Sequence, residues 1–202
     1  MKRCLIWGGG ILASFLVAAF CMGAVMNSLF GMAAVKNGDW YTSLLAGDTG
    51  ADPYSKAAVA VGGLLATRLQ DSMYYRLTDI DGEPLKANCD YRLQGEELDA
   101  NWWSVTAYGP NHFLMPNASD RYSFNNGNVQ RKSDGSYVIR ISRTPQPGNW
   151  LPIGEVRQPD SLLFGGEPQE FDLLLRLYVP GRVYLNQPAM APLPRLVKEV
   201  CR

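Results

Sequence analysis

Histidine is almost missing from this 202-residue sequence, in which His112 is the only one. A metal site built from several histidines is therefore excluded, and no G-x-S-x-G pattern supplies a serine nucleophile beside His112. The four cysteines form no Cys-x-x-Cys motif, so a zinc or redox site has no basis either. We expect no cofactor and no metal, and we assign no catalytic residue.

A net positive charge is also missing. The chain has 19 basic and 19 acidic residues, and only Lys2 and Arg3 among them precede residue 36. A protein that holds nucleic acid by its phosphates needs a basic surface. The charge balance therefore excludes nucleic acid as a partner.

Charge of either sign is absent from Cys4 to Val35. About 20 helical residues span a bilayer, so residues 1–35 are predicted to be a membrane anchor with its span at about 5–26. Lys2 and Arg3 favour a cytoplasmic N-terminus, which places the C-terminal domain in the periplasm of a bacterial inner-membrane protein. The alternative is a signal peptide cut near residues 31–33, which the length of the run disfavours.

Small residues recur at every fourth position of this segment, at Gly10, Ser14 and Ala18 and again at Ala19 and Gly23. Such a helix face lets another transmembrane helix approach closely, which predicts a partner in the membrane. The alternative is that a segment rich in glycine and alanine contains these spacings by chance.

Two cysteines, Cys89 and Cys201, lie in the part predicted to be exported. In an oxidising compartment we expect them to form a disulfide. The alternative is a frayed terminal thiol at Cys201 and a small buried packing residue at Cys89.

The exported part is predicted to begin with a juxtamembrane connector over residues 36–51, with Trp40 and Tyr41 at the level of the lipid headgroups. A single domain follows over residues 52–202. Asp52 and the proline after it are typical of a helix start, and apolar residues at helical spacing predict a helix over residues 54–70.

From Met73 onward, short runs rich in Tyr, Val, Ile and Trp alternate with Asp-Gly and Asn-Gly turns. This composition predicts a mainly β domain, a jelly-roll-like antiparallel β-sandwich. The expected strands are 73–78, 90–93, 103–108, 122–124, 129–131, 137–142, 151–153 and 171–178. Alternation predicts that Trp150 and one of Trp102 and Trp103 are buried between the sheets, opposite a strand whose inward residues are Phe171, Leu173, Leu175 and Leu177.

Three stretches in this order carry a family resemblance: NWWSVTAYGPNHFLMPNASDRYSF from Asn101, DGSYVIRISRTPQPGNWLPIGE from Asp134 and FDLLLRLYVPG from Phe171. With the DPYSKAAVAVGGLLA helix and the LTDIDGEPLKANCDYRL hairpin before them, they resemble the domain of unknown function 1214 family over most of residues 52–184. The resemblance implies a jelly-roll β-sandwich. Members occur beside a domain of unknown function 1254 or alone behind an N-terminal membrane segment, and this chain is similar to the second form. No reaction is established for the family.

Loops of the predicted sandwich combine amide, guanidinium and aromatic side chains of the kind that bind a glycan or a peptide. The alternative for each is a structural role, because asparagine bridges turn backbones, arginine can cap the ends of sheets, and tryptophan after a proline turn often fills the interior of a sandwich. The candidate ligand-binding residues are Asn117, Arg121, Tyr122, Asn149, Trp150, His112 and Trp102.

Two functions remain open from the sequence. The first is a membrane-anchored, non-enzymatic binding or accessory subunit of an envelope or membrane complex. The second is a hydrolase or other carbohydrate-active enzyme with a cleft at one end of the sandwich, which a concave pocket with at least two convergent ionisable groups would favour. The acidic pairs Glu96–Glu97 and Asp79/Asp81 are interpreted as solvated turn residues.

Overall fold

A computed structural model describes residues 2–32, 34–44, 47, 50–61, 67–154 and 170–201, without the helical side chains at 2–8, 26–32, 58 and 61. The chain divides into two compact units, Met1–Ala34 with Ser43–Thr67 and Val35–Thr42 with Arg68–Arg202. Each unit is described by itself.

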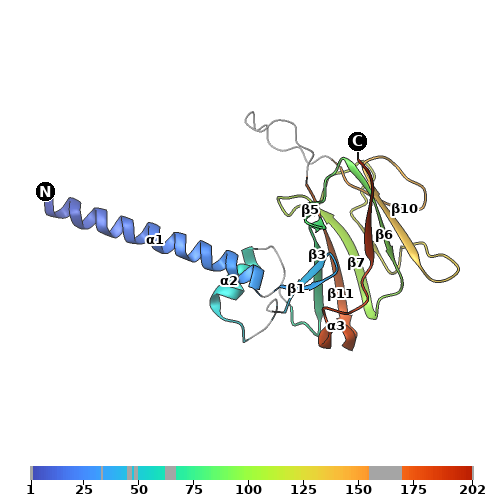
Figure 1. Cartoon of the computed structure of the whole chain (residues 1–202), viewed down its shortest axis with the longest axis horizontal. Coiled ribbons are helices and arrows are strands. Elements are labelled where there is room, and N and C mark those ends of the chain that lie inside the picture. The colour runs from blue at the N-terminus through green and yellow to red at the C-terminus, as the bar shows by residue number, and fades with distance from the viewer. Residues whose placement is uncertain are drawn as a thin grey trace. The chain divides into compact units, whose positions relative to one another are not determined.

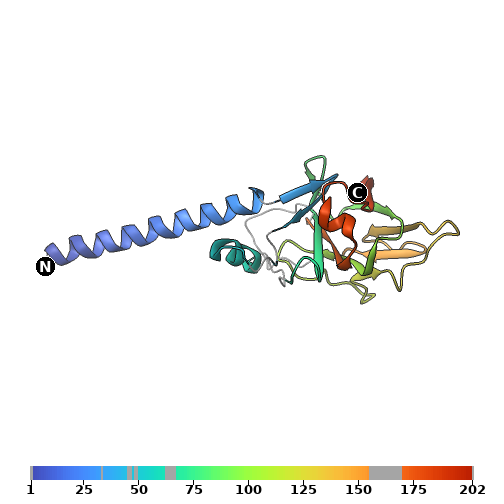
Figure 2. The ribbon, with the colours of Figure 1, turned by 90° about the horizontal axis from the view of Figure 1, so that it is seen from below.

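The first unit holds two helices, α1 (Lys2–Met32) and α2 (Pro53–Val61). Figure 2 shows α1, in blue, as one continuous helix. Its described side chains, over residues 9–25, are all exposed, among them Ile11, Phe15 and Phe20. Within the described residues, no helix has the length and hydropathy of a membrane span. Membrane insertion of residues 5–26 stays a prediction.

Asp52 caps α2, as the sequence predicts. Its Oδ2 accepts a hydrogen bond from Ser55 Oγ at 2.5 Å, and its Oδ1 accepts from the backbone N–H groups of Ser55 and Tyr54 at 3.2 and 2.8 Å. These bonds satisfy donors that the first helical turn leaves open, and they lower the pKa of the Asp52 carboxyl. The predicted helix over residues 54–70 is shorter in the structure: α2 ends at Val61, residues 62–66 lie outside the described residues, and residues 67–71 are not helical.

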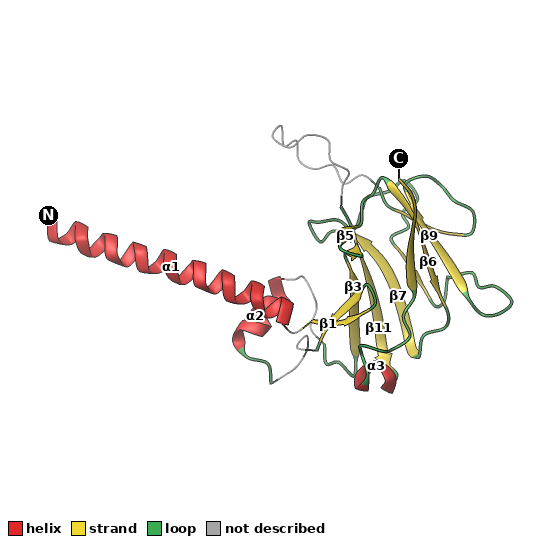
Figure 3. Ribbon diagram, viewed as in Figure 1, coloured by secondary structure: helices red, strands yellow, loops and turns green. Residues whose placement is uncertain are grey.

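The second unit consists mainly of two β-sheets (Figures 1 and 3). The larger sheet has the order β1-β2-β3-β11-β7-β8, with strands Ala34–Asn37, Trp40–Ser43, Ser72–Leu77, Asp172–Pro180, Ala100–Tyr108 and Ser123–Asn125. The smaller sheet has the order β10-β9-β6-β12, with strands Asn149–Pro152, Tyr137–Ser142, Cys89–Gly95 and Arg195–Cys201. The hairpin β4 (Asp79–Ile80) and β5 (Glu83–Pro84) and the short helix α3 (Arg182–Asn186) complete the described elements. The expected mainly β sandwich is confirmed.

The inner faces of the two sheets meet in an aromatic and aliphatic core. Trp103 of β7 is fully buried and stacks on Tyr137 of β9, with ring centroids 5.0 Å apart. The prediction that one of Trp102 and Trp103 is buried is therefore confirmed. The predicted inward residues of the strand after residue 170 are also all buried: Phe171, Leu173, Leu175 and Leu177.

The prediction that Trp150 is buried between the sheets is wrong. Alternation along β10 turns its neighbours Asn149 and Leu151 inward, so Trp150 is only half-buried and its Nε1 donates to the carbonyl of Ser142 at 3.0 Å.

β10 also departs from the expected antiparallel pattern. It pairs with β9 in parallel, with Asn149 opposite Ile139. Parallel neighbours are normally joined by a crossover of a dozen or more residues, whereas residues 143–148 alone connect these two strands. A hydrogen bond of 2.9 Å from Arg140 Nη1 to the carbonyl of Pro147 braces the returning chain.

Residues 34–43 form the β1–β2 hairpin at the edge of the larger sheet, although residues 36–51 are predicted to be a connector. Trp40 is 3% exposed, and its Nε1 donates to the carbonyl of Pro194 at 2.7 Å. The expectation that Trp40 lies at headgroup level is therefore wrong, because the ring belongs to the protein core.

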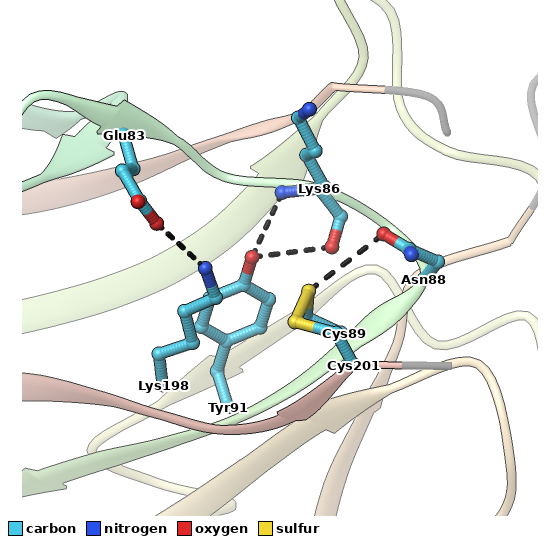
Figure 4. Close-up of a disulfide and its surroundings, with 7 residues drawn as sticks. All are labelled: Glu83, Lys86, Asn88, Cys89, Tyr91, Lys198 and Cys201. Atoms are coloured by element: carbon cyan, nitrogen blue, oxygen red, sulfur yellow. Dashed lines mark hydrogen bonds and ion pairs between the residues drawn. A yellow bond between two sulfur atoms is a disulfide. The ribbon is translucent and has the colours of Figure 1, made fainter. Parts of the chain in front are cut away.

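Cys89 and Cys201 form the predicted disulfide, with Cα atoms 3.9 Å apart (Figure 4). They lie opposite each other on β6 and β12. The bridge attaches the C-terminal strand, which is missing from the predicted strands, to the smaller sheet. Residues 129–131, in contrast, form no strand, and Arg131 makes only an isolated bridge to Tyr137.

Candidate ligand-binding site

The side of the larger sheet that faces away from the core is the candidate site. Side chains alternate along a strand, so the core-facing residues 173, 175 and 177 of β11 direct the residues between them to this other side. The strand register places residues of β3 and β7 beside them. We call this surface the outer face, and its residues on these three strands are Ser72, Tyr74, Arg76, Trp102, Ser104, Thr106, Tyr108, Asp172, Leu174, Arg176 and Tyr178.

Arg76 and Asp172 form an ion pair on the outer face. Arg76 Nε donates to Asp172 Oδ2 at 2.8 Å, and Arg76 Nη2 donates to the same oxygen. The Asp172 side chain is 9% exposed, and burial raises the pKa of its carboxyl, an effect that Arg76 and then His112 oppose. Tyr41 of β2 lies opposite Arg76, and burial raises its pKa as well.

His112 reaches the same cluster from the turn after β7. Its backbone has φ +62°, a left-handed conformation in which histidine is enriched, and its N–H donates to the carbonyl of Gly109 at 2.9 Å. The distance from Arg76 Nη2 to His112 Nδ1 is 3.0 Å. Since a guanidinium has only donors, Nδ1 is the acceptor. This candidate residue is exposed, as a loop histidine is expected to be, but it contacts the outer face.

Arg176 forms a second cationic group on the outer face. Its Nη1 donates to Thr106 Oγ1 at 3.1 Å, its Nη2 donates to the Tyr108 hydroxyl, and its guanidinium lies 5.4 Å from the centre of the Tyr108 ring. Among the described residues, no carboxylate pairs with this half-buried side chain. The positive charge of Arg176 is therefore solvated by neutral oxygens and an aromatic ring.

Trp102 and Tyr178 end the outer face near α3. They are 39% and 38% exposed, and their rings meet edge to face with centroids 5.3 Å apart. Trp102 is the outward member of the tryptophan pair, for which the sequence predicts only that one ring points inward and the other outward. Val179, the next residue of β11, has φ +48°, which is strained for a β-branched residue, and its N–H donates to the carbonyl of Asp71 at 2.9 Å.

The loop residue Asn117 has a structural role. Its Oδ1 accepts from the backbone N–H groups of Ser119 and Arg121 at 3.1 and 3.3 Å, and its Nδ2 donates to the carbonyls of Met115 and Arg121 at 3.2 and 3.0 Å. Tyr122 donates its hydroxyl to Asp120 at 3.2 Å. The polar atoms of this loop are thus largely used in shaping the loop itself.

Asn149 is also structural, because it is buried and bonded on both sides. Its Oδ1 accepts from the N–H of Gln130 at 2.7 Å, and its Nδ2 donates to the carbonyls of Gln130 and Val138 at 2.8 and 3.0 Å. Arg121 joins the two predicted loops, since its Nη1 donates to the carbonyl of Trp150 at 3.2 Å and its guanidinium stacks over Phe124. Of the seven candidates, the structure brings only His112 and Trp102 to the outer face.

Among the described residues, two concave regions bear on the enzymatic alternative. The first, of about 530 Å³, lies away from the outer face and is lined by the β6 end, the loop with Glu96 and Glu97, and Arg195. Glu97 is more than a solvated turn residue, because it pairs with Arg131 and accepts from Trp103 Nε1 at 3.1 Å. The second, of about 290 Å³, borders the outer face and is lined by residues that include Asp79, Glu170 and Asp172. Within the described residues, no group of three potential ligands could hold a metal ion.

The main residues that the sequence left unassigned are Arg76, Arg176, Tyr108 and Asp172. Alternation in FDLLLRLYVPG indicates that Arg176 points away from the core. No comparable signal joins Arg76 to Asp172, which are 96 positions apart and meet only because β3 pairs with β11.

The fold of this chain resembles that of a solved structure. The VPA0106 protein from Vibrio parahaemolyticus has 20% sequence identity with it and a TM-score of 0.57, over 75% of this chain and 36% of that protein. An uncharacterised protein from Burkholderia cenocepacia has 16% identity and a TM-score of 0.42, over 90% of this chain and 41% of the other. The chain therefore spans less than half the length of either protein.

No curated protein matches the chain. A family model described as "Protein of unknown function (DUF1214)" matches residues 70–182, from just before β3 to the start of α3. This match covers more than half of the chain, which therefore belongs to the DUF1214 family.

Proposed function

We propose that this protein is anchored in a bacterial inner membrane by one helix and displays its β-sandwich in the periplasm as a non-enzymatic binding or accessory subunit. The observation that carries the binding role is the outer face, where Arg176 has no carboxylate partner among the described residues and exposed aromatic rings lie beside it. Half-buried charge and exposed aromatic groups are costly in a purely structural surface and are typical of ligand contacts.

The sequence supports the anchor. Residues 4–35 carry no charge, and this run is longer than the roughly 20 helical residues that a hydrocarbon core requires. The described side chains between residues 9 and 25 are exposed and almost entirely apolar. Such a surface is unfavourable in water, so we assign it to lipid. The spaced small residues from Gly10 to Gly23 are then available to a partner helix.

The disulfide supports the periplasmic location of the sandwich. Structural disulfides form and persist in oxidising compartments, and they are rare in the cytosol. Cys89 and Cys201 both belong to the sandwich, whereas the free and exposed Cys21 belongs to α1. Lys2 and Arg3, which precede the apolar run, favour the cytoplasmic side for the N-terminus.

An enzymatic role is the second candidate, favoured by the region of about 290 Å³ that several carboxyl groups line. Burial raises the pKa of Asp172, as it does for carboxyl groups that act as general acids. The Oδ2 atom of Asp172 is, however, occupied by two hydrogen bonds from Arg76, which favours a binding role over proton transfer.

Membrane fractionation of the full chain tests the anchor and its orientation. Expressed in a bacterium with two membranes, the protein should stay in the inner membrane after alkaline carbonate washing, and protease should reach the sandwich in spheroplasts but not in intact cells. Replacing Phe15 and Leu16 by Asp should abolish retention, because charged residues at the bilayer centre are costly, whereas replacing both by Val should preserve it. A soluble periplasmic protein that lacks the α1 residues by intact mass would contradict the anchor.

Purification in mild detergent tests the accessory role. A partner that co-purifies with the wild type and is lost when Gly10, Ser14 and Ala18 are replaced by Leu would support a membrane complex. If the protein hydrolyses a bound ligand and Asp172→Asn abolishes this hydrolysis, the enzymatic role would be favoured instead.

A further inference from the structure

We propose that the outer face binds a saccharide that carries a carboxylate, with the carboxylate at Arg176 and an adjoining sugar ring on Trp102 and Tyr178. This inference rests on the proposed binding function and names the class of its ligand.

The charge of the outer face favours an anion. Arg76 is neutralised by Asp172, but Arg176 has no acidic partner among the described residues. The three groups together carry a net charge of about +1 on a domain whose overall charge is slightly negative. An anionic ligand group would remove the cost of this half-buried cation, which pairs with no carboxylate of the described residues.

The donors around Arg176 suit a carboxylate. A guanidinium offers five N–H groups in a planar fork, which matches the two oxygens of a carboxylate. The Tyr108 hydroxyl accepts a hydrogen bond from Arg176, so its own proton is left to be donated. Thr106 is buried and holds the guanidinium from below. Arg176 and Tyr108 thus supply donors of the type that an anion requires.

The aromatic pair suits a sugar ring. Tyr178 lies two residues after Arg176 on β11, which is roughly 7 Å along the strand and comparable with the size of a sugar ring. Tyr178 and Trp102 are each more than a third exposed and present both an apolar ring and a polar group. The strained backbone of Val179, directly after Tyr178, is held by its bond to Asp71, and strain of this kind clusters at functional sites.

A peptide strand is a poorer fit than a saccharide. β11 is a central strand, paired with β3 on one side and β7 on the other, so its backbone hydrogen-bonding groups are already used. A peptide that recognises a sheet by adding a strand needs an open edge. The outer face instead offers side-chain donors and rings, which carboxylate, hydroxyl and ring groups of a saccharide can meet.

Calorimetric titration of the full chain in detergent micelles tests the inference. The probe is trigalacturonic acid, and its neutral counterpart is the trimethyl ester of the same trisaccharide. We expect the acid to bind at least tenfold more tightly than the ester, and the preference to weaken as ionic strength rises. Arg176→Gln should reduce affinity for the acid about tenfold or more and remove the preference. Trp102→Ala should reduce the affinity for the acid and for the ester to a similar extent.

A matched control distinguishes binding at the outer face from binding at the cleft of about 530 Å³. Arg195→Gln removes an exposed arginine that lines the cleft of about 530 Å³, and it should leave affinity unchanged. Melting curves should be alike for Arg176→Gln, Arg195→Gln and wild type, so that lost binding reports lost contacts. If Arg176→Gln does unfold, Arg176→Lys keeps the charge without the planar fork and should still lose most of the affinity for the acid.

The inference would be overturned by equal affinity for acid and ester, by loss of binding in Arg195→Gln but not Arg176→Gln, or by tighter binding of a hexaglutamate peptide than of trigalacturonic acid. Binding of the neutral ester alone, lost in Trp102→Ala, would reject the acidic saccharide and keep the proposed binding function. No binding of any of these probes, with an intact membrane anchor, would reject the inference and leave only the accessory role.

Discussion

Cys89 and Cys201 lie directly opposite each other on β6 and β12, and their disulfide closes a stretch of 112 positions. β12 is an edge strand, so it has a single neighbour in the sheet. Beside the bridge, Lys198 of the same strand bonds Glu83 of the β4–β5 hairpin at 2.8 Å (Figure 4). The C-terminus is therefore held to the sandwich by one covalent bond and by side-chain contacts of β12.

Removing this disulfide should destabilise the sandwich. Cys201→Ser is expected to lower the free energy of unfolding by about 2–5 kcal/mol, because a long cross-link restricts the unfolded chain. Denaturant titration of the oxidised protein measures this loss. Cys21→Ser, which removes an exposed cysteine of α1 that is not in a disulfide, is the control and should leave the sandwich unchanged. Equal stability of Cys201→Ser and wild type would show that the bridge is dispensable.

The two tryptophans at positions 103 and 150 should differ in their effect on stability. Trp103→Ala removes a fully buried ring and is expected to cost about 3–5 kcal/mol. Trp150→Ala removes a half-buried ring and should cost about half as much or less. Thermal unfolding followed by near-ultraviolet circular dichroism ranks the two variants, and the reverse order would contradict the deeper burial of Trp103.

Tyr137→Phe should stabilise the protein by about 1 kcal/mol. The Tyr137 hydroxyl is buried and, within the described residues, has no hydrogen-bond partner, so its removal relieves a desolvation cost. Tyr184→Phe is the matched control, because that buried hydroxyl donates to the carbonyl of Pro192 at 2.9 Å and its loss should cost about 1 kcal/mol. Chemical unfolding that shows Tyr137→Phe to be the less stable of the two would refute this assignment.

Glu83 should titrate below its ordinary pKa of 4.5, because the hydrogen bond and the charge of Lys198 favour its carboxylate. A pKa that is lower in the folded state means that the pair contributes stability above about pH 4.5 and loses it as the pH falls through the folded pKa. Carbon-detected NMR titration of the side-chain carboxyl measures the midpoint. Lys198→Met should return it toward 4.5, whereas Lys132→Met should not. An unchanged midpoint in Lys198→Met would exclude the pair as the cause.

Local patterns were sufficient for several elements. The cap at Asp52 depends on atoms within three residues, and the alternation of Phe171, Leu173, Leu175 and Leu177 depends only on strand geometry. Trp40 shows the limit of such patterns. An aromatic residue shortly after an apolar run suits both a lipid interface and a core, and only the carbonyl of Pro194, far along the chain, decides for the core.

The sequence by itself determined a charge-free N-terminal helix, a mainly β domain, the identity of the two paired cysteines and the face of β11 that enters the core, because composition and period carry each of these. Only the tertiary structure decided which residues meet on the outer face. Arg76, His112 and Asp172 converge because β3 pairs with β11 and the turn after β7 folds back, and pairing over such separations leaves no local pattern. The parallel pairing of β10 with β9 also depends on tertiary contacts, namely the hydrogen bonds from Asn149 to Gln130 and Val138.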